Sequence, residues 1–114
     1  MTMERVDASL LRRNVQVAYL DLSTEEAIRR WGEPEITWDD LGPWNTFVFR
    51  LADGTLAGLV REVENAPKPG YFLLAGNEES GTPEGIDTTD ALAAFLSEAP
   101  FEEERVLERY PLAR

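Results

Sequence analysis

The segment from Glu33 to Trp44 gathers the residue types of this chain that could do chemistry. Trp38 and Trp44 flank two adjacent carboxylates, Asp39 and Asp40. Paired acids can serve as general acid and base in glycoside hydrolysis. Histidine and cysteine, the usual general base and thiolate nucleophile, are both absent from the sequence. A chain of 114 residues also offers little room for an enclosed cleft. We therefore expect a binding protein rather than an enzyme, with no cofactor and no metal site.

The same segment has the composition of a protein-binding hot spot. It carries four acids, and no Lys or Arg occurs between Trp31 and Phe49. Rigid aromatic anchors contribute much of the affinity at interfaces, and surrounding acids favour a cationic partner. The alternative is structural, with Trp38 and Trp44 plugging the open end of a sheet, because tryptophan is largely buried on average. The sequence leaves both interpretations open.

A second acidic region lies between Pro69 and Glu104, which holds nine acidic residues and no Lys or Arg. The net charge of the whole chain is −11, so most of the excess lies in this stretch. A one-sided negative field steers basic partners and repels nucleic acid and anionic membranes. We therefore expect a basic protein partner, with binding to neither nucleic acid nor membrane. The predicted partner-binding residues of the two regions are Glu78, Glu79, Glu84, Trp38, Asp39, Asp40 and Trp44.

Motifs for phosphate, nucleic acid and calcium are missing. Gly54 and Gly58 form neither a Walker nor a Rossmann pattern. The arginine pairs 12–13 and 29–30 are isolated, which argues against a basic nucleic-acid patch. The oxygen-rich segment 84–90 lacks the spacing of an EF-hand loop.

The elements that must position these residues begin with a strand and a helix. Val15, Val17 and Tyr19 alternate along residues 14–20, which favours a strand. Ser23, with Glu26 three residues later, forms a capping box that predicts a helix over 24–31. Gly32 and Pro34 end that helix.

A second helix is predicted over 88–98. Asp87 is the expected N-cap, Asp90 favours the positive N-terminal end, and Pro100 ends the helix. Its apolar residues recur at helical spacing and are predicted to face the core: Leu92, Phe95, Leu96 and Ala99.

The clearest local signal is a hairpin around Asp53-Gly54. Asp-Gly between alternating segments predicts a two-residue turn. The register that follows pairs Leu51 with Leu56, Phe49 with Gly58 and Phe47 with Val60. That register places one set of apolar side chains on a single core face: Phe47, Phe49, Leu51, Leu56 and Val60. Gly58 opposite Phe49 would leave room for the aromatic ring.

Together these elements predict an α+β fold in one domain, 1–114. The expected antiparallel sheet has about four strands, near 14–20, 46–51, 56–63 and 70–75, with the two helices packed on one face. Residues 71–75 are apolar on both faces, so this strand is expected to lie centrally. A longer turn is predicted at 66–70, and the tail from Phe101 to Tyr110 fits either a short helix or an edge strand.

No apolar run in the sequence approaches the roughly 18 residues that a membrane span needs. The N-terminal residues carry no apolar region typical of a secretory signal. The expected location is therefore the cytoplasm.

Two consecutive features carry a resemblance to a known class of protein. The run Thr24–Pro34 forms a short capped helix that ends in Gly-x-Pro, and the run Phe47–Leu56 forms an Asp-Gly hairpin. In these features the chain resembles the immunity proteins of bacterial polymorphic and contact-dependent toxin systems. The resemblance implies cytoplasmic action and a cognate toxin, often a nuclease, whose basic groove would suit the acids.

Other binding functions fit the same charge. The chain could be a small interaction or ligand-binding module, or a DNA mimic that inhibits a nucleic-acid-binding protein. A mimic needs carboxylates spaced like phosphates, which a sequence does not reveal. High net charge also keeps a small protein soluble without any partner.

Overall fold

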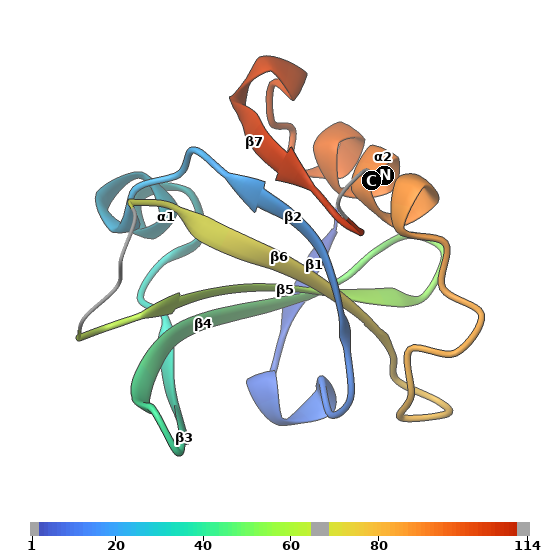
Figure 1. Cartoon of the computed structure of the whole chain (residues 1–114), viewed down its shortest axis with the longest axis horizontal. Coiled ribbons are helices and arrows are strands. Elements are labelled where there is room, and N and C mark those ends of the chain that lie inside the picture. The colour runs from blue at the N-terminus through green and yellow to red at the C-terminus, as the bar shows by residue number, and fades with distance from the viewer. Residues whose placement is uncertain (1–2, 65–68, 112–114) are drawn as a thin grey trace.

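The computed structural model describes residues 3–64 and 69–111 and shows an α+β fold (Figure 1). Its antiparallel sheet has seven strands in the described residues, in the order β1-β4-β5-β6-β2-β7, and β3 pairs with β4 beside β1. In chain order the elements are β1 Glu4–Val6, the 3₁₀ turn η1 Ala8–Leu10, β2 Val15–Leu20, α1 Thr24–Trp31, β3 Glu35–Asp39, β4 Gly42–Arg50, β5 Thr55–Glu62, β6 Tyr71–Asn77, α2 Thr88–Glu98, η2 Glu103–Arg105 and β7 Val106–Arg109.

The fold class is confirmed, but the prediction of about four strands is wrong. The four predicted strands correspond to β2, β4, β5 and β6, and β6 lies centrally as expected. The three additional strands, β1, β3 and β7, all lie at the margins of the sheet. They are short and rich in charged residues; β1 and β7 pair with strands distant in the chain, whereas β3 pairs with the adjacent strand β4. The ambiguous tail contains both forms, since η2 is followed by the edge strand β7.

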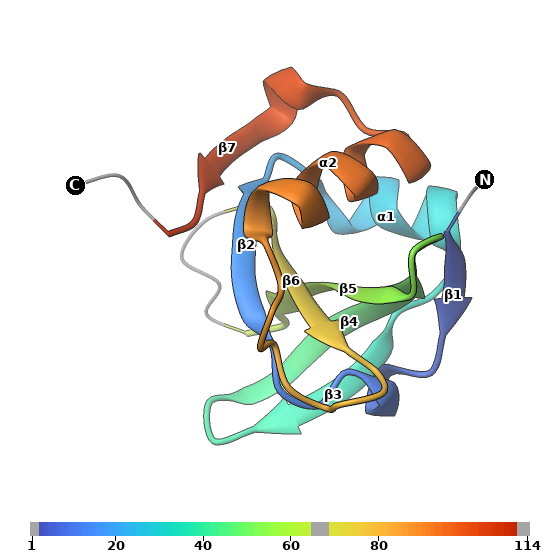
Figure 2. The same ribbon diagram turned by 90° about the vertical axis from the view of Figure 1, so that its right-hand side faces the viewer.

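Both helices form where their capping residues predict. The Ser23 hydroxyl accepts a hydrogen bond from the Glu26 N–H at 3.1 Å, and the Asp87 carboxylate accepts one from the Asp90 N–H at 3.0 Å. Gly32, with φ of 87°, ends α1 in a conformation that favours glycine. Figure 2 shows α1 and α2 on the same side of the sheet.

The β4–β5 hairpin forms, but its predicted register is wrong by one residue. The Leu51 N–H donates to the Thr55 carbonyl at 2.8 Å, so the loop has three residues instead of two. Gly54 takes φ of 91° at its third position, the geometry of a turn followed by a bulge. Phe49 therefore lies opposite Ala57, and Gly58 lies opposite Val48.

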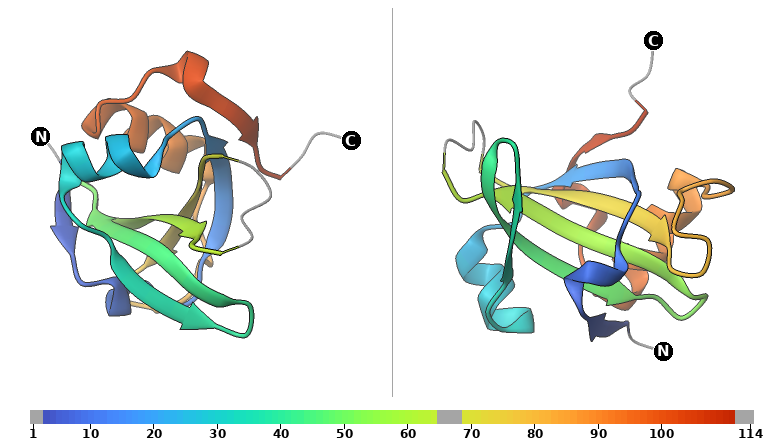
Figure 3. Two further views of the ribbon diagram at one scale, coloured as in Figure 1. Left: turned by 90° about the vertical axis from the view of Figure 1, so that its left-hand side faces the viewer. Right: turned by 90° about the horizontal axis from the view of Figure 1, so that it is seen from below.

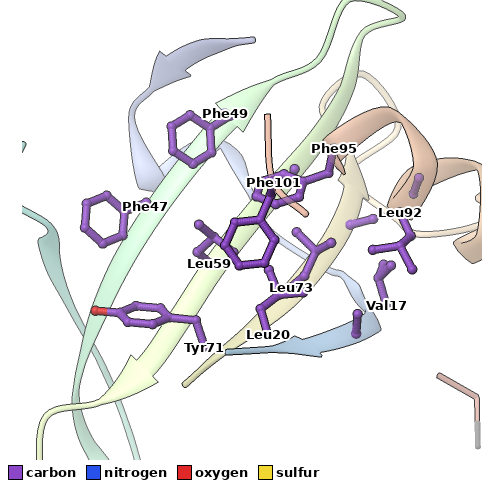
Figure 4. Close-up of a cluster of buried hydrophobic side chains, with 14 of the residues drawn as sticks. Val17, Leu20, Phe47, Phe49, Leu59, Tyr71, Leu73, Leu92, Phe95 and Phe101 are labelled. Atoms are coloured by element: carbon purple, nitrogen blue, oxygen red, sulfur yellow. The ribbon is translucent and has the colours of Figure 1, made fainter. Parts of the chain in front are cut away.

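The corrected register also corrects the core. The main cluster takes Phe47 and Phe49 from β4, Leu51 directly after it, and Ala57 and Leu59 from β5. Figure 4 shows Phe47, Phe49 and Leu59 gathered with residues of β6 and α2. Leu56 and Val60, predicted for this face, lie on the other face of the sheet. Leu56 packs there with Ala8 and Val48 in a second buried cluster, and Val60 lines a groove.

The second face is covered only in part. The segment between β1 and β2 crosses it, and Leu11 lies so close to Gly58 and Gly76 that a Cβ at either glycine would collide with it. Gly58 thus makes room for Leu11, not for Phe49. The other end of this face is left open as a groove. The turn predicted at 66–70 lies largely outside the described residues.

Candidate functional site

The segment 33–44 contains strand β3 and the start of β4. Asp39 pairs with Gly42 across a two-residue turn, and the Asp39 carboxylate accepts a hydrogen bond from the Leu41 N–H at 2.8 Å. Gly42 adopts φ of 118°, which is costly for residues with a Cβ. Further along, the hydroxyls of Thr37 and Thr46 share a hydrogen bond of 2.8 Å. These contacts hold the β3–β4 hairpin in a defined shape.

Exposed apolar side chains concentrate on this hairpin and the adjoining end of β5. Trp38 is 74% exposed, Leu41 69%, Ile36 50% and Val63 48%, and one more large exposed hydrophobic residue is found among the described residues, Leu107 on β7. The Val63 N–H donates to the Pro43 carbonyl at 3.0 Å, which holds Val63 against the hairpin. Four exposed apolar residues in one place indicate a binding surface rather than scattered exposure.

Unpaired acids accompany these apolar residues. The carboxylates of Asp40, Glu62 and Glu64 make no hydrogen bond or ion pair in the part of the chain that the structure describes. We call the combined set the hairpin surface: Ile36, Trp38, Leu41, Val63, Asp40, Glu62 and Glu64. It joins apolar anchors with uncompensated negative charge.

The open end of the second sheet face forms a groove of about 330 Å³ behind the hairpin. Its floor is apolar, with Val60, Phe72 and Leu74, and Gln16 lies on the β2 side. The remaining lining residues are Asn14, Thr37, Trp38, Asp39 and Trp44. Residues from β2 and β3 line one groove because the sheet curves. Figure 3 shows this curvature from below and from the side.

The structure separates the two tryptophans that the sequence left undecided. Trp44 is half-buried in the groove wall, and its indole N–H is buried without a hydrogen-bond partner among the described residues. Trp38 is exposed, so it does not plug the sheet. Trp38 is therefore the aromatic residue available to a partner.

The acidic loop after β6 has a different character. The Glu78 carboxylate is bound by Arg50 at 2.7 Å, and the Arg12 guanidinium donates to the Glu78 carbonyl at 3.2 Å. The ion pair raises the pKa of Arg50. Glu79 and Glu84 are exposed beside shallow hollows of about 520 and 220 Å³ near the Asp53–Thr55 turn. Of the three predicted residues of this loop, Glu78 has its charge compensated.

The hairpin surface and the acidic loop lie at opposite ends of β4. Trp44 is near one end of that strand, and Arg50, the partner of Glu78, is at the other, roughly 20 Å away at 3.3 Å per residue. Figure 1 shows the hairpin at the lower left and the loop before α2 at the lower right. The predicted residues Trp38, Asp39, Asp40 and Trp44 are brought together, whereas Glu78, Glu79 and Glu84 form a separate group.

Several arginines are held by the protein itself. Arg105 hydrogen-bonds to Glu26 at 2.9 Å and lies over the Phe101 ring at 4.3 Å, which fastens η2 and β7 to α1. The hydrogen bonds from Arg105 lower the pKa of Glu26. The guanidinium of Arg5 donates to the carbonyls of Trp31 and Glu33, each at 2.6 Å. These positive charges serve the fold and do not neutralise the hairpin surface.

The oxygen-rich segment 84–90 serves the helix. Its Asp87 side chain caps α2, and within the described residues no three acidic side chains converge as metal ligands would. Among the helices of the described chain, none has the length and apolar character needed to cross a membrane.

Sequence reasoning missed five residues of the hairpin surface: Ile36, Leu41, Glu62, Val63 and Glu64. The alternation of Glu-Ile-Thr-Trp-Asp over 35–39 was a strand signal, and Asp40-Leu41-Gly42 was the matching turn. Comparison of this chain with family models, with curated proteins and with solved structures finds no match.

Proposed function

We propose that this protein is an acidic binding domain that engages a basic partner protein, and that it acts as an immunity protein blocking a cognate bacterial toxin. The observation that carries the proposal is the hairpin surface. Four exposed apolar side chains lie there beside carboxylates that form no ion pair within the described residues. Apolar anchors supply affinity, and the charge selects a cationic partner.

Binding alone is sufficient for this function. Asp39 and Asp40 are both exposed at a hairpin turn, and one oxygen of Asp39 is occupied by the Leu41 N–H. Two carboxylates of a glycosidase would instead face each other across an enclosed substrate site. An inhibitor that covers a basic groove needs shape, apolar anchors and charge, which is what the hairpin surface offers. The proposal places its action in the cytoplasm.

The test is binding to, and protection against, the toxin-like product of a neighbouring gene. We expect co-expression of this chain to restore growth of cells that produce the toxin. Trp38→Ala should weaken the complex by about 2 kcal/mol, roughly thirtyfold in Kd, because aromatic hot-spot residues carry that much. Leu107→Ala removes an exposed apolar residue from β7 and should leave the Kd unchanged.

The same measurement separates the two acidic regions. Reversing the charges of Glu79 and Glu84 should change how strongly the Kd depends on salt concentration. The affinity contributed by Trp38 should remain. A Kd of the Trp38→Ala variant equal to that of the wild type, or a complex insensitive to salt, would contradict the proposal. Isothermal titration calorimetry at two salt concentrations provides the values.

A further inference from the structure

Strand β3 is an edge strand with one side open. Among the described elements it pairs only with β4, from Glu35 opposite Thr46 to Asp39 opposite Gly42. β1 occupies the same side of β4 further along, opposite Val48–Arg50, and does not cover the outer side of β3. The backbone N–H and C=O groups along that outer side are therefore free to pair with another strand. Figure 3 shows β3 at the margin of the molecule.

This edge is protected only by its shortness and by two acidic residues at its ends, Glu35 and Asp39. Natural edge strands are blunted by short length, by charged side chains (lysine above all), by proline or by a β-bulge. The segment Glu35–Asp39 contains neither lysine nor proline, and its register with β4 is continuous. An exposed edge of this kind is a template for strand addition.

The side chains of β3 specify what could be added. Alternation along the strand puts Ile36 and Trp38 on one face, and both are at least half exposed. Glu35, Thr37 and Asp39 share the other face. A strand beside β3 would meet apolar side chains on one face and, on the other, the carboxylates of Glu35 and Asp39, which also accept hydrogen bonds from the N–H groups of Ala8 and Leu41.

We propose that β3 binds an extended segment of the basic partner by strand addition, and that this segment alternates Lys or Arg with apolar residues. The inference rests on the proposed function and names the recognition element of the partner. A second copy of this chain fits poorly as the occupant. Full antiparallel overlap of two β3 strands would place Glu35 opposite Asp39 of the other copy, and like charges directly opposite are destabilising.

The test uses the full chain and a capped seven-residue peptide of alternating lysine and valine. We expect the peptide to bind and to shift the amide NMR signals of 35–39. Two further peptides carry N-methyl groups on alternate amides, one in each phase. The peptide whose N-methyl groups replace the N–H groups facing β3 should bind at least tenfold more weakly than the unmethylated peptide. The peptide methylated in the other phase should bind as the unmethylated peptide does. Equal binding of both phases, or of a peptide with its lysines and valines in two blocks, would overturn strand addition.

Matched variants locate the binding edge. Ile36→Lys places a positive charge on the exposed face of β3 and should raise the Kd of the alternating peptide at least tenfold. Leu107→Lys makes the same kind of change on β7, the opposite edge of the sheet, and should have no effect. Loss of binding in the β7 variant instead, or peptide-induced dimers in sedimentation, would overturn the assignment to β3.

The outcomes also separate this inference from the proposed function. A toxin that binds the wild type, is insensitive to Ile36→Lys and is not displaced by the peptide leaves the proposed function standing and refutes strand addition. A peptide that binds β3 in a chain that protects against no toxin refutes the immunity function and keeps the strand-addition site.

Discussion

Some acidic residues of this domain stabilise the fold, and others lie on the surface without a partner among the described residues. Asp87 caps α2, Glu26 anchors Arg105, and Glu78 holds Arg50. Asp40 and Glu62 have no such partner within the described residues. The net charge of −11 therefore overstates what a partner can use. The position of each carboxylate decides its role, and the type of residue does not.

Asp87→Ala should destabilise the protein by about 1 kcal/mol, because the substitution removes the side-chain acceptor for the Asp90 N–H at the start of α2. Glu84→Ala removes a nearby exposed acid that makes no side-chain hydrogen bond within the described residues, so it should leave stability unchanged. Urea unfolding of both variants measures the difference. Equal stabilities for the two variants would show that the cap contributes nothing.

The ion pair between Glu26 and Arg105 predicts a pH dependence of stability. Its hydrogen bonds lower the pKa of Glu26 below the ordinary value of 4.5. The stabilisation is therefore fully present above pH 4.5 and is lost as the pH falls through the lower folded-state pKa. Glu26→Gln should cost about 1 to 2 kcal/mol at neutral pH, and this deficit should shrink in acid.

Glu25→Gln is the matched control on the same helix. Glu25 is exposed and its contact with Arg29 is long, at 3.5 Å, so the variant should track the wild type at every pH. Urea midpoints measured between pH 3 and 7 test both variants. A Glu26→Gln deficit that persists unchanged at the lowest pH would contradict the assignment.

At the scale of elements, the crossing segment between β1 and β2 depends on two glycines. Gly58→Ala should cost about 1 to 3 kcal/mol because its new Cβ collides with the Leu11 side chain. In a Leu11→Ala background that cost should largely disappear. Gly76→Ala should stay costly in the same background, because the Arg13 carbonyl lies only 2.8 Å from its Cβ. Equal costs of Gly58→Ala in both backgrounds, by urea unfolding, would contradict this packing.

The elements also show how far sequence reasoning reached. Helices α1 and α2 were predicted within their bounds because capping by Ser23 and Asp87 is local. The Asp53-Gly54 turn was found, but the choice between two and three loop residues depends on the final twist, and that choice decided which face Leu56 and Val60 occupy. Strands β1 and β7 were missed because their partners lie far along the chain, whereas β3, which pairs with the adjacent β4, was missed although its alternation and its turn are local. Of the candidate site, Trp38, Asp39, Asp40 and Trp44 were predicted from the sequence. The exposed apolar residues Ile36, Leu41 and Val63 were not.

At the scale of the whole molecule, we expect the net charge to govern the association rate with the partner and the hairpin surface to govern the dissociation rate. Two double variants change the net charge by the same amount: Asp40→Lys with Glu62→Lys on the hairpin surface, and Glu79→Lys with Glu84→Lys in the acidic loop. Long-range steering depends on the overall field, so both should slow association with the basic partner, most clearly at low salt. Dissociation depends on contacts, so the hairpin variant alone should dissociate faster, by about tenfold or more. Surface plasmon resonance separates the two rates. Faster dissociation of the loop variant alone would move the contact surface to the other end of β4.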